Sequence, residues 1–277
     1  MDAGRRRTGG GAQARRRGAL QPPPGLRPGA RRRSALRLTG KNAPQDAWQA
    51  LFAPGETVGL KFNRISQDFT GANQAIADAI VVEAARVEFA GGKPRPGWAG
   101  EYDFGSGRTR LSEFLVNQVD ALINVPNLKH HPLAGFTGCL KSISHANDTI
   151  MEGPDRFHRN ACNPYIADIY AIEAIRSKVR LQVMNSLVGI FDRGAYPPLP
   201  KFQWPHNAIL LGVDPVALDA IGAESVDAAR AEAAKRPVRR DRRALRYLET
   251  AAERRLGQCR PDHIQKVAIT IDADGGP

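Results

Sequence analysis

The chain has 277 residues, 42% of them hydrophobic, which is enough apolar material for a buried core in one large domain or two small ones. Its net charge of +12 comes from its ends: residues 1–37 carry +10 and residues 230–260 carry +7, so the remainder is mildly acidic at −5. Three widely spaced cysteines without a Cys-x-x-Cys pair argue against an iron–sulfur cluster, a dithiol site and a disulfide framework, and no apolar run reaches the roughly 18 residues that cross a bilayer.

Residues 1–37 consist almost entirely of Arg, Gly, Ala and Pro, and we predict a disordered tail because such a segment buries too little apolar surface to offset its chain entropy. The tail is either an electrostatic arm for nucleic acid, a tail without function, or translated upstream sequence. Its Arg clusters resemble the start of an export signal, but no apolar segment follows them. A cytoplasmic location is therefore expected, with export left open if the true start or signal is missing.

Residues 38–277 are predicted to form a single α/β domain, and its first half alternates strand and helix. A short helix precedes an apolar strand at 58–62, and residues 71–86 have apolar positions at helical spacing. Residues 91–110 are rich in Gly, Pro and Arg, which predicts an irregular loop. A short helix over 111–119 then leads to a buried strand over 120–126, ending at Pro126.

The second half continues this alternation. Asn163 and Pro164 are placed to begin a long helix as N-cap and first helical residue. A strand follows over 179–190, and another strand delivers Asp214 as the cap of a helix that starts at Pro215. A basic amphipathic helix stopped by Gly257 and a closing strand, "HIQKVAITID", complete the chain. The fold class predicted is α/β, a layered sheet of mixed or mainly parallel strands with flanking helices.

Polar residues follow several of these strands. Were the strands neighbours in one sheet, their polar ends would meet at one edge, where α/β proteins bind ligands. Lysines beside imidazoles suit a small anionic ligand such as a carboxylate or a phosphate. The alternative is that Lys61 and Asp214 only satisfy backbone groups and caps. The candidate ligand-binding residues are Lys61, Asn63, Lys129, His130, His145, Asn147, Asp192 and Asp214.

The spacing of the histidines along the chain predicts that not all of them belong to one site. His130 and His131 are adjacent, so in an extended segment they point to opposite sides and at most one belongs to a site. Lys141 and His145 share a face if that segment is helical. His158 lies in a loop, where a histidine is more often a surface residue than a ligand.

The cysteine of this region is Cys139. Neither histidine is fixed beside it by spacing, so a small buried hydrophobe is favoured over a nucleophile.

Four segments together resemble a bacterial family known as domain of unknown function 362, over roughly residues 45–270. They are "WQALFAPGETVGLKFN", "INVPNLKHHPLAGFTGCLKSI", "GPDRFHRNACNPYIADI" and "NAILLGVDPVALDAIGAE". Members of that family often carry a ferredoxin-type cysteine cluster or a twin-arginine signal. This chain has no such cluster and no complete signal, and the region between Arg86 and Leu111 is shorter than usual, so that part of the site is expected to be missing.

A shorter segment, "HPLAGFTGCLK" at 131–141, is similar to a segment of nickel-pincer lactate racemases. That resemblance implies His131 as a catalytic acid/base, Lys141 as the carrier of the pincer nucleotide and His158 as a nickel ligand. The segment that supplies the second acid/base histidine has no counterpart here, since residues 103–110 contain no His.

Three functions therefore remain open. The first is an enzyme acting on a small anion through His131 and Lys141, either isomerase- or racemase-like or redox-associated. The second is a noncatalytic protein that binds a metal or small ligand, including as partner of an iron–sulfur system. The third is nucleic-acid association through the basic tail. Substrate, cofactor and oligomeric state are not defined by the sequence.

Overall fold

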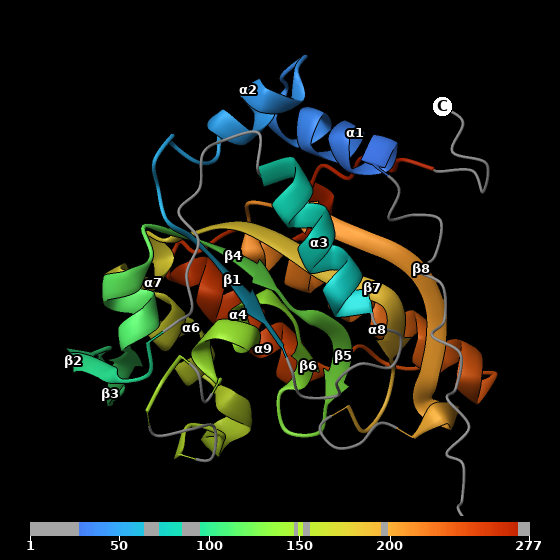
Figure 1. Cartoon of the computed structure of the whole chain (residues 1–277). Coiled ribbons are helices and arrows are strands. Elements are labelled where there is room, and N and C mark those ends of the chain that lie inside the picture. Colours follow the sequence, from blue (N-terminus) through green and yellow to red (C-terminus); the bar gives the residue numbers. More distant parts are fainter. Residues whose placement is uncertain are drawn as a thin grey trace, which may run out of the picture.

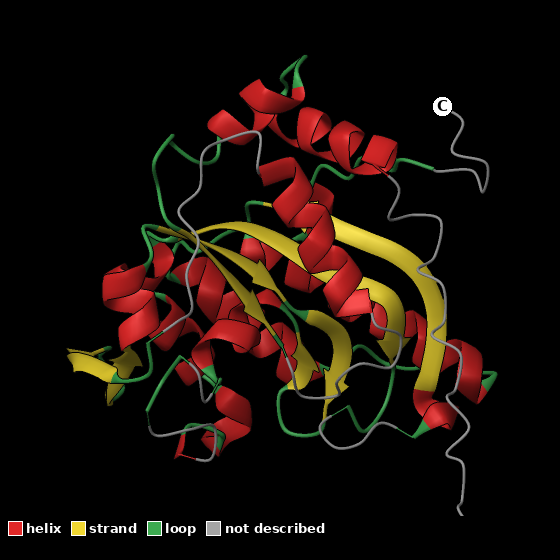
Figure 2. Ribbon diagram, in the orientation of Figure 1, coloured by secondary structure: helices red, strands yellow, loops and turns green. Residues whose placement is uncertain are grey.

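The computed structural model describes residues 28–63, 72–84, 95–146, 149–151, 156–194 and 199–270. A six-stranded sheet forms the middle layer, with helices packed on both of its faces (Figure 1). Figure 2 shows the three layers, with the yellow strands between two groups of red helices. The predicted α/β fold class is confirmed.

The sheet is mixed and mainly parallel. β1 is parallel to β4, β4 and β5 are both parallel to β7, and the antiparallel strands β6 and β8 pair with β5 and β7. The strands are β1 (Val58–Phe62), β4 (Ala121–Val125), β5 (Asn127–His131), β6 (Gly135–Thr137), β7 (Val179–Ile190) and β8 (Gln203–Gly212).

β4 and β5 are two parts of one interrupted strand. Leu122 pairs with Val179 at the start of β7, and Asn127 pairs with Asn185 further along it. Only Pro126 separates the two parts, because proline has no N–H to donate to a ladder. The strand predicted to end at Pro126 therefore continues to His131.

One face of the sheet is covered by α1 (Pro28–Thr39), α2 (Pro44–Gln49) and α3 (Ala72–Ala84), which lie together in the upper part of Figure 1. Their apolar side chains form one core with alternate residues of the strands. This core contains Trp48, Phe52, Ile76, Ile80, Ile123, Val125, Leu181 and Val183.

The opposite face is covered by four helices and has the larger core. This core includes Leu122, Leu140, Ile166, Met184 and Tyr247. The helices are α4 (Cys139–Ser144), α6 (Tyr165–Tyr170), α8 (Pro215–Ala234) and α9 (Arg242–Glu253). The remaining short elements are η2 (Phe114–Gln118), η3 (Arg159–Cys162), α7 (Glu173–Arg176), η4 (Pro200–Phe202) and η5 (Pro261–His263).

The predicted boundary of the tail is wrong. α1 begins at Pro28, so the last ten residues of the segment predicted as a tail form most of a helix. Ala, Leu and Arg have high helix propensity, and Leu38 packs against the core beneath α2 and α3. Residues 1–27 lie outside the described residues.

The loop predicted over 91–110 is also partly wrong. β2 (Trp98–Asp103) and β3 (Arg108–Ser112) pair as an antiparallel hairpin, with Gly105 at φ 84° in its turn. Short strands with a single buried face give a weak sequence signal, and the glycines that suggested a loop supply the turn.

Two predictions in the second half differ from the structure. The helix predicted from Asn163 is split into α6 and α7, because Ile172 is extended (φ −53°, ψ 125°), and the Asn163 side chain forms no cap. The closing strand predicted at "HIQKVAITID" is absent from its described residues, which run on from η5 without pairing to the sheet. By contrast, Asp214 caps α8, as predicted.

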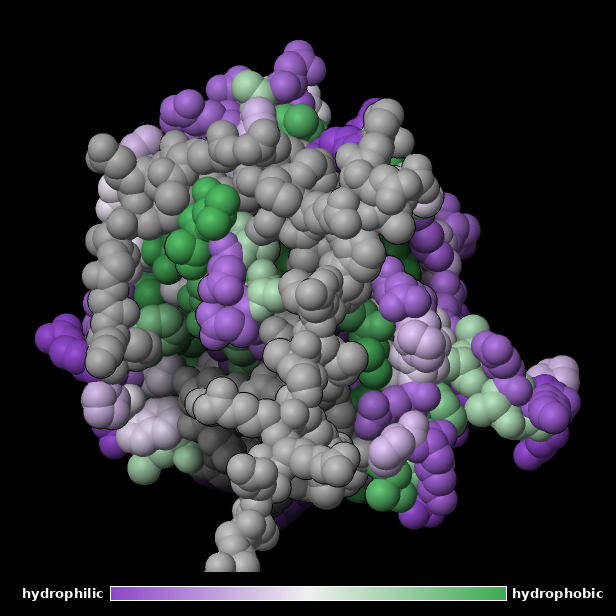
Figure 3. Space-filling model, turned by 45° about the vertical axis from the view of Figure 1, so that its right-hand side comes forward, coloured by the Kyte–Doolittle hydropathy of each residue, from purple (hydrophilic) through white to green (hydrophobic). Residues whose placement is uncertain are grey.

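Hydrophobic and hydrophilic residues are interspersed on the face shown in Figure 3. Val81 and Val82 on α3 are each 56% exposed, so that side of α3 is not covered by described residues. Within the described ranges, no helix has the length and apolar character needed to cross a membrane.

Candidate functional site

The site lies where the interrupted strand β4–β5 exchanges one neighbouring strand, β1, for another, β6. β1 pairs with β4 up to Val125, and the antiparallel β6 pairs with β5 from Lys129 onward. The ladder on this edge is therefore interrupted between Val125 and Lys129, at the carboxyl ends of parallel strands. Such a change of strand order is a common place for ligands in α/β proteins.

Three buried lysines gather here from different elements. Lys61 lies on β1, Lys129 on β5 and Lys141 on α4, and they are only 7%, 2% and 6% exposed. Burial and the charges of Lys141 and Lys61 lower the pKa of Lys129 to about 7. Burial lowers the pKa of Lys141 to about 8. Both lysines can therefore exchange protons near neutral pH.

Three histidines complete the group. The rings of His131 and His158 are stacked at 5.3 Å, and His145 meets His158 edge-on at 5.2 Å. Lys141 Nζ lies 3.0 Å from His158 Nε2. The sequence-predicted residues that the fold brings together form what we call the Lys–His cluster: Lys61, Lys129, Lys141, His131, His145 and His158.

Hydrogen bonds fix the tautomers of two of these rings. His145 Nε2 donates to the carbonyl oxygen of Phe157 at 3.0 Å, so its Nδ1 accepts from the Ser144 hydroxyl at 2.9 Å. His131 Nδ1 accepts from the N–H groups of Leu133 and Ala134, at 3.2 and 3.1 Å. Burial is the main cause that lowers the pKa of both rings, and the charge of Lys141 adds to it.

Cys162 belongs to the same region, although no sequence pattern pointed to it. Burial raises the pKa of its thiol to about 11, while the charge of Lys141 opposes that shift. Asn160, Ala161 and Cys162 all have left-handed backbone, with φ of 51°, 56° and 64°. Three successive left-handed residues other than glycine are costly and tend to occur near functional sites.

His130 points away from the cluster, as its spacing predicted. Its Nδ1 is 3.5 Å from Asp192 and its Nε2 is 3.9 Å from Asp241, on the other side of β5. Burial and the charge of Arg230 lower the pKa of His130 to about 4, although both carboxylates oppose this. The predicted ligand-binding residues His130 and Asp192 are thus together, but apart from His131.

Of the remaining predicted site residues, Asn63 and Asp214 make hydrogen bonds that stabilise the fold. Asn63 N–H donates to Val125 O at 3.1 Å, and Asn127 Nδ2 donates to Asn63 O at 3.1 Å. Asp214 lies at the opposite edge of the sheet, because β8 runs antiparallel to β7, and its carboxylate accepts from Val216, Ala217 and Gln258 N–H groups. Asn147 lies outside the described residues.

A carboxylate from α8 holds the helix that carries Lys141. Asp219 is fully buried and accepts from the N–H groups of Cys139 and Leu140 at the start of α4. Gly138 allows this approach, since a Cβ there would overlap Asp219. Burial raises the pKa of Asp219 to about 7, although both hydrogen bonds oppose the shift.

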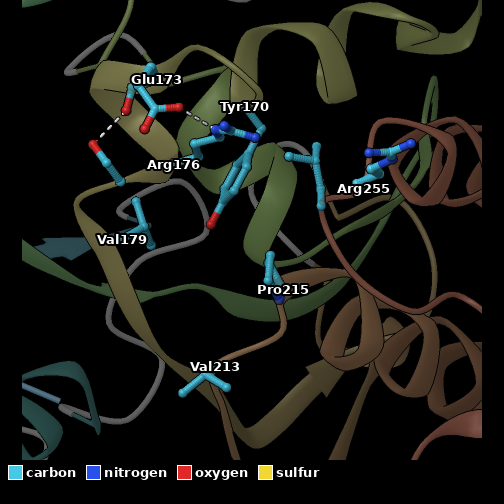
Figure 4. Close-up of a pocket in the computed structure, with 9 residues that line it drawn as sticks. Tyr170, Glu173, Arg176, Val179, Val213, Pro215 and Arg255 are labelled. Carbon is cyan, nitrogen blue, oxygen red and sulfur yellow. Dashed lines mark hydrogen bonds and ion pairs between the residues drawn. The ribbon is translucent and has the colours of Figure 1, made fainter. Parts of the chain in front are cut away.

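One cavity lies away from the Lys–His cluster. A cavity of about 340 Å³ opens at the amino edge of the parallel strands, between the start of β7 and the start of α8 (Figure 4). Tyr170 and Pro215 line it, and Arg176 is held by Glu173 at 2.5 Å. This cavity contains none of the predicted site residues.

No three His, Cys, Asp or Glu side chains are arranged to hold a metal ion in the part of the chain that the structure describes. The described residues of the cluster offer hydrogen-bond donors and ammonium groups.

Residues 70–224 match the model of a family described as Domain of unknown function (DUF362). The matched segment includes β4, β5, β7 and most of the Lys–His cluster. Comparison with curated proteins and with solved structures finds no match.

Proposed function

The chain belongs to the DUF362 family, whose description assigns no activity, and from the geometry of the Lys–His cluster we propose that it binds a small anion at the carboxyl edge of the sheet. The observation that carries this proposal is the convergence of three buried lysines and three imidazoles from β1, β5, α4 and the following loops.

Electrostatics favours an anion over a neutral or cationic ligand. Like charges at Lys61 and Lys141 oppose the charged form of Lys129, so the cluster is cationic and partly desolvated. A carboxylate or phosphate bound there would offset the repulsion and accept charge-assisted hydrogen bonds. The same anion would keep the lysines protonated.

Within this proposal, an enzyme differs from a binding protein in needing a group that loses and regains a proton. Lys129 and Lys141 are suited to this role, with pKa values of about 7 and about 8. A proton-transfer reaction on a bound anion, such as an isomerisation, is the activity that these residues support best. A binding protein would use the same lysines without turnover.

The binding proposal is tested with inorganic phosphate as probe, by calorimetry on the full chain at pH 7. We expect Lys129→Met to weaken phosphate binding at least tenfold, because a charge-assisted hydrogen bond and a buried charge are lost together.

Lys178→Met is the matched control. Lys178 donates to the carbonyls of Leu115, Val116 and Val119 near the amino edge of β7. This variant should lose stability but keep the affinity of the wild type. Equal affinity in wild type and Lys129→Met, or no binding by the wild type, would count against the proposal.

A second candidate concerns Lys141 as carrier of a covalently bound nucleotide. It is favoured by the 3.0 Å contact between Lys141 and His158 and by the stacking of His158 on His131, the three residues that the shorter resemblance singles out. Because the described residues offer no multi-ligand metal site, this candidate is limited to the covalent attachment.

Intact-protein mass spectrometry tests the second candidate. We expect a mass above that of the sequence in wild type and the sequence mass in Lys141→Met. A wild-type chain with the mass of its sequence, after expression in a host that makes the nucleotide, would contradict it.

A further inference from the structure

The strongest constraint within the cluster concerns the two nitrogens of His131. Nδ1 accepts from two consecutive backbone N–H groups, those of Leu133 and Ala134. An accepting ring nitrogen carries no hydrogen, so the neutral ring has its hydrogen on Nε2. The backbone after β5 therefore decides which tautomer is present.

A second proton would have to enter at Nδ1. It would replace the acceptor of both N–H groups with a donor, and both would lose their hydrogen bonds. The loop from His131 to β6 closes a short antiparallel connection, with Gly135 at φ 79°. The Ala134 N–H is part-buried and has little access to another acceptor, whereas the Leu133 N–H is exposed and can bond to water.

The charged and titratable groups that face the ring also disfavour a second proton. They are Lys129 on β5, Lys141 on α4, His145 after α4 and His158 on the stacked face, and each opposes the charged form of His131. Burial acts in the same direction.

We infer that the loop after β5 fixes His131 as the Nε2–H tautomer, a hydrogen-bond donor that selects oxyanions. This inference rests on the proposed anion-binding function and gives His131 a donor role in place of the acid/base role implied by the shorter resemblance. Like the lysine ammonium groups, the Nε2–H group can only donate. A ligand must therefore present an acceptor oxygen, and the lysine charges favour a negatively charged one, as in a carboxylate or phosphate, whereas a protonated amine offers only donors.

Nuclear magnetic resonance of the full chain with ¹⁵N-labelled histidine tests the tautomer. His131→Gln identifies the His131 signals by their disappearance. We expect the Nε2–H form at pH 7. An Nδ1–H form would overturn the inference. This result does not depend on ligand binding, so it can fail or succeed separately from the anion-binding proposal.

Two variants test selection, with inorganic phosphate and acetate as separate probes. Gln can place an amide N–H near the position of Nε2–H, whereas Leu fills the space without a donor. We expect His131→Gln to bind the preferred probe within about threefold of wild type, and His131→Leu to bind it roughly tenfold more weakly. The probe with the larger loss identifies phosphate or carboxylate as the preferred oxyanion.

Wild-type affinity in His131→Leu would overturn the donor role. So would a His131→Gln variant as weak as His131→Leu, because the ring would then supply more than a donor. If His131→Leu does not fold, the tautomer measurement on the wild type still decides the inference.

Discussion

The free energy of unfolding of the ligand-free chain should rise by about 1–2 kcal/mol between pH 7 and pH 8.5. In the folded state the pKa values of Lys129 and Lys141 are lowered from 10.5 to about 7 and about 8. The unfolded chain keeps both protons in this window, while the folded chain releases them. Because the unfolded state then binds more protons, stability increases with pH, by at most about 1.4 kcal/mol per pH unit for each lysine.

Asp219, whose pKa is raised to about 7, opposes this rise only near the start of the window, and the window ends near pH 8.5 because the cysteines act in the opposite direction above it. The pKa of Cys162 is raised from 9.0 to about 11, so its contribution to stability is lost as the pH rises above the unfolded value. Urea unfolding at three pH values within the window is the appropriate measurement.

Lys129→Met should reduce the slope, and the exposed Lys266→Met should leave it unchanged. Saturating phosphate should also reduce the slope, because an anion that binds the charged lysines raises their pKa values. A flat profile for the wild type, or an unchanged slope in Lys129→Met, would show that the buried lysines are not the titrating groups.

Asp219→Ala should lower the free energy of unfolding by about 3 kcal/mol, the largest effect expected of a single substitution here. The variant leaves the N–H groups of Cys139 and Leu140 without an acceptor in a fully buried place. It also loosens the start of α4, which carries Lys141, so phosphate affinity should fall with stability. Chemical unfolding combined with calorimetry measures both effects.

Asp219→Asn should be milder, at about 1 kcal/mol, because an amide oxygen can still accept one of the two hydrogen bonds. Asp214→Ala provides the comparison: it removes the cap of α8 at a half-buried position where water can replace the carboxylate, and should cost about 1–2 kcal/mol without affecting phosphate binding. A cost below about 1 kcal/mol for Asp219→Ala would show that the start of α4 does not depend on this carboxylate.

Asp219 holds the start of α4 through two hydrogen bonds, whereas the buried lysines supply the positive charge of the site. The substitution that disturbs position should therefore reduce stability at every pH, whereas Lys129→Met should change mainly its pH dependence.

Much of the fold follows from local sequence pattern. The apolar runs at β1, β4, β7 and β8 and the helical spacing of α3 and α8 predicted those elements, and Asp214 with Pro215 predicted the start of α8. These patterns depend only on residues close in sequence, so they can be recognised without knowing which elements pack together in the fold. The hairpin β2–β3 was missed because its short strands give a weak pattern, and the break between α6 and α7 was missed because the apolar spacing continues through the extended Ile172.

The opposite orientations of His130 and His131 were also determined by the sequence, since adjacent residues of a strand alternate between its faces. The sequence placed lysines and histidines after strand ends and thereby named most of the Lys–His cluster. It did not determine which of them meet, because strand direction and strand order are set by pairing between distant segments.

Only the tertiary structure decided that Asp214 lies at the far edge, because β8 is antiparallel, and that Cys162 lies near enough to Lys141 to interact with its charge. It also decided the chemical state of His131, whose Nδ1 is occupied by two N–H groups of its own loop. Residue type and spacing identify a side chain as a candidate for a site. Its hydrogen bonds and its distance from other charges, which arise only on folding, determine whether it can accept a proton there.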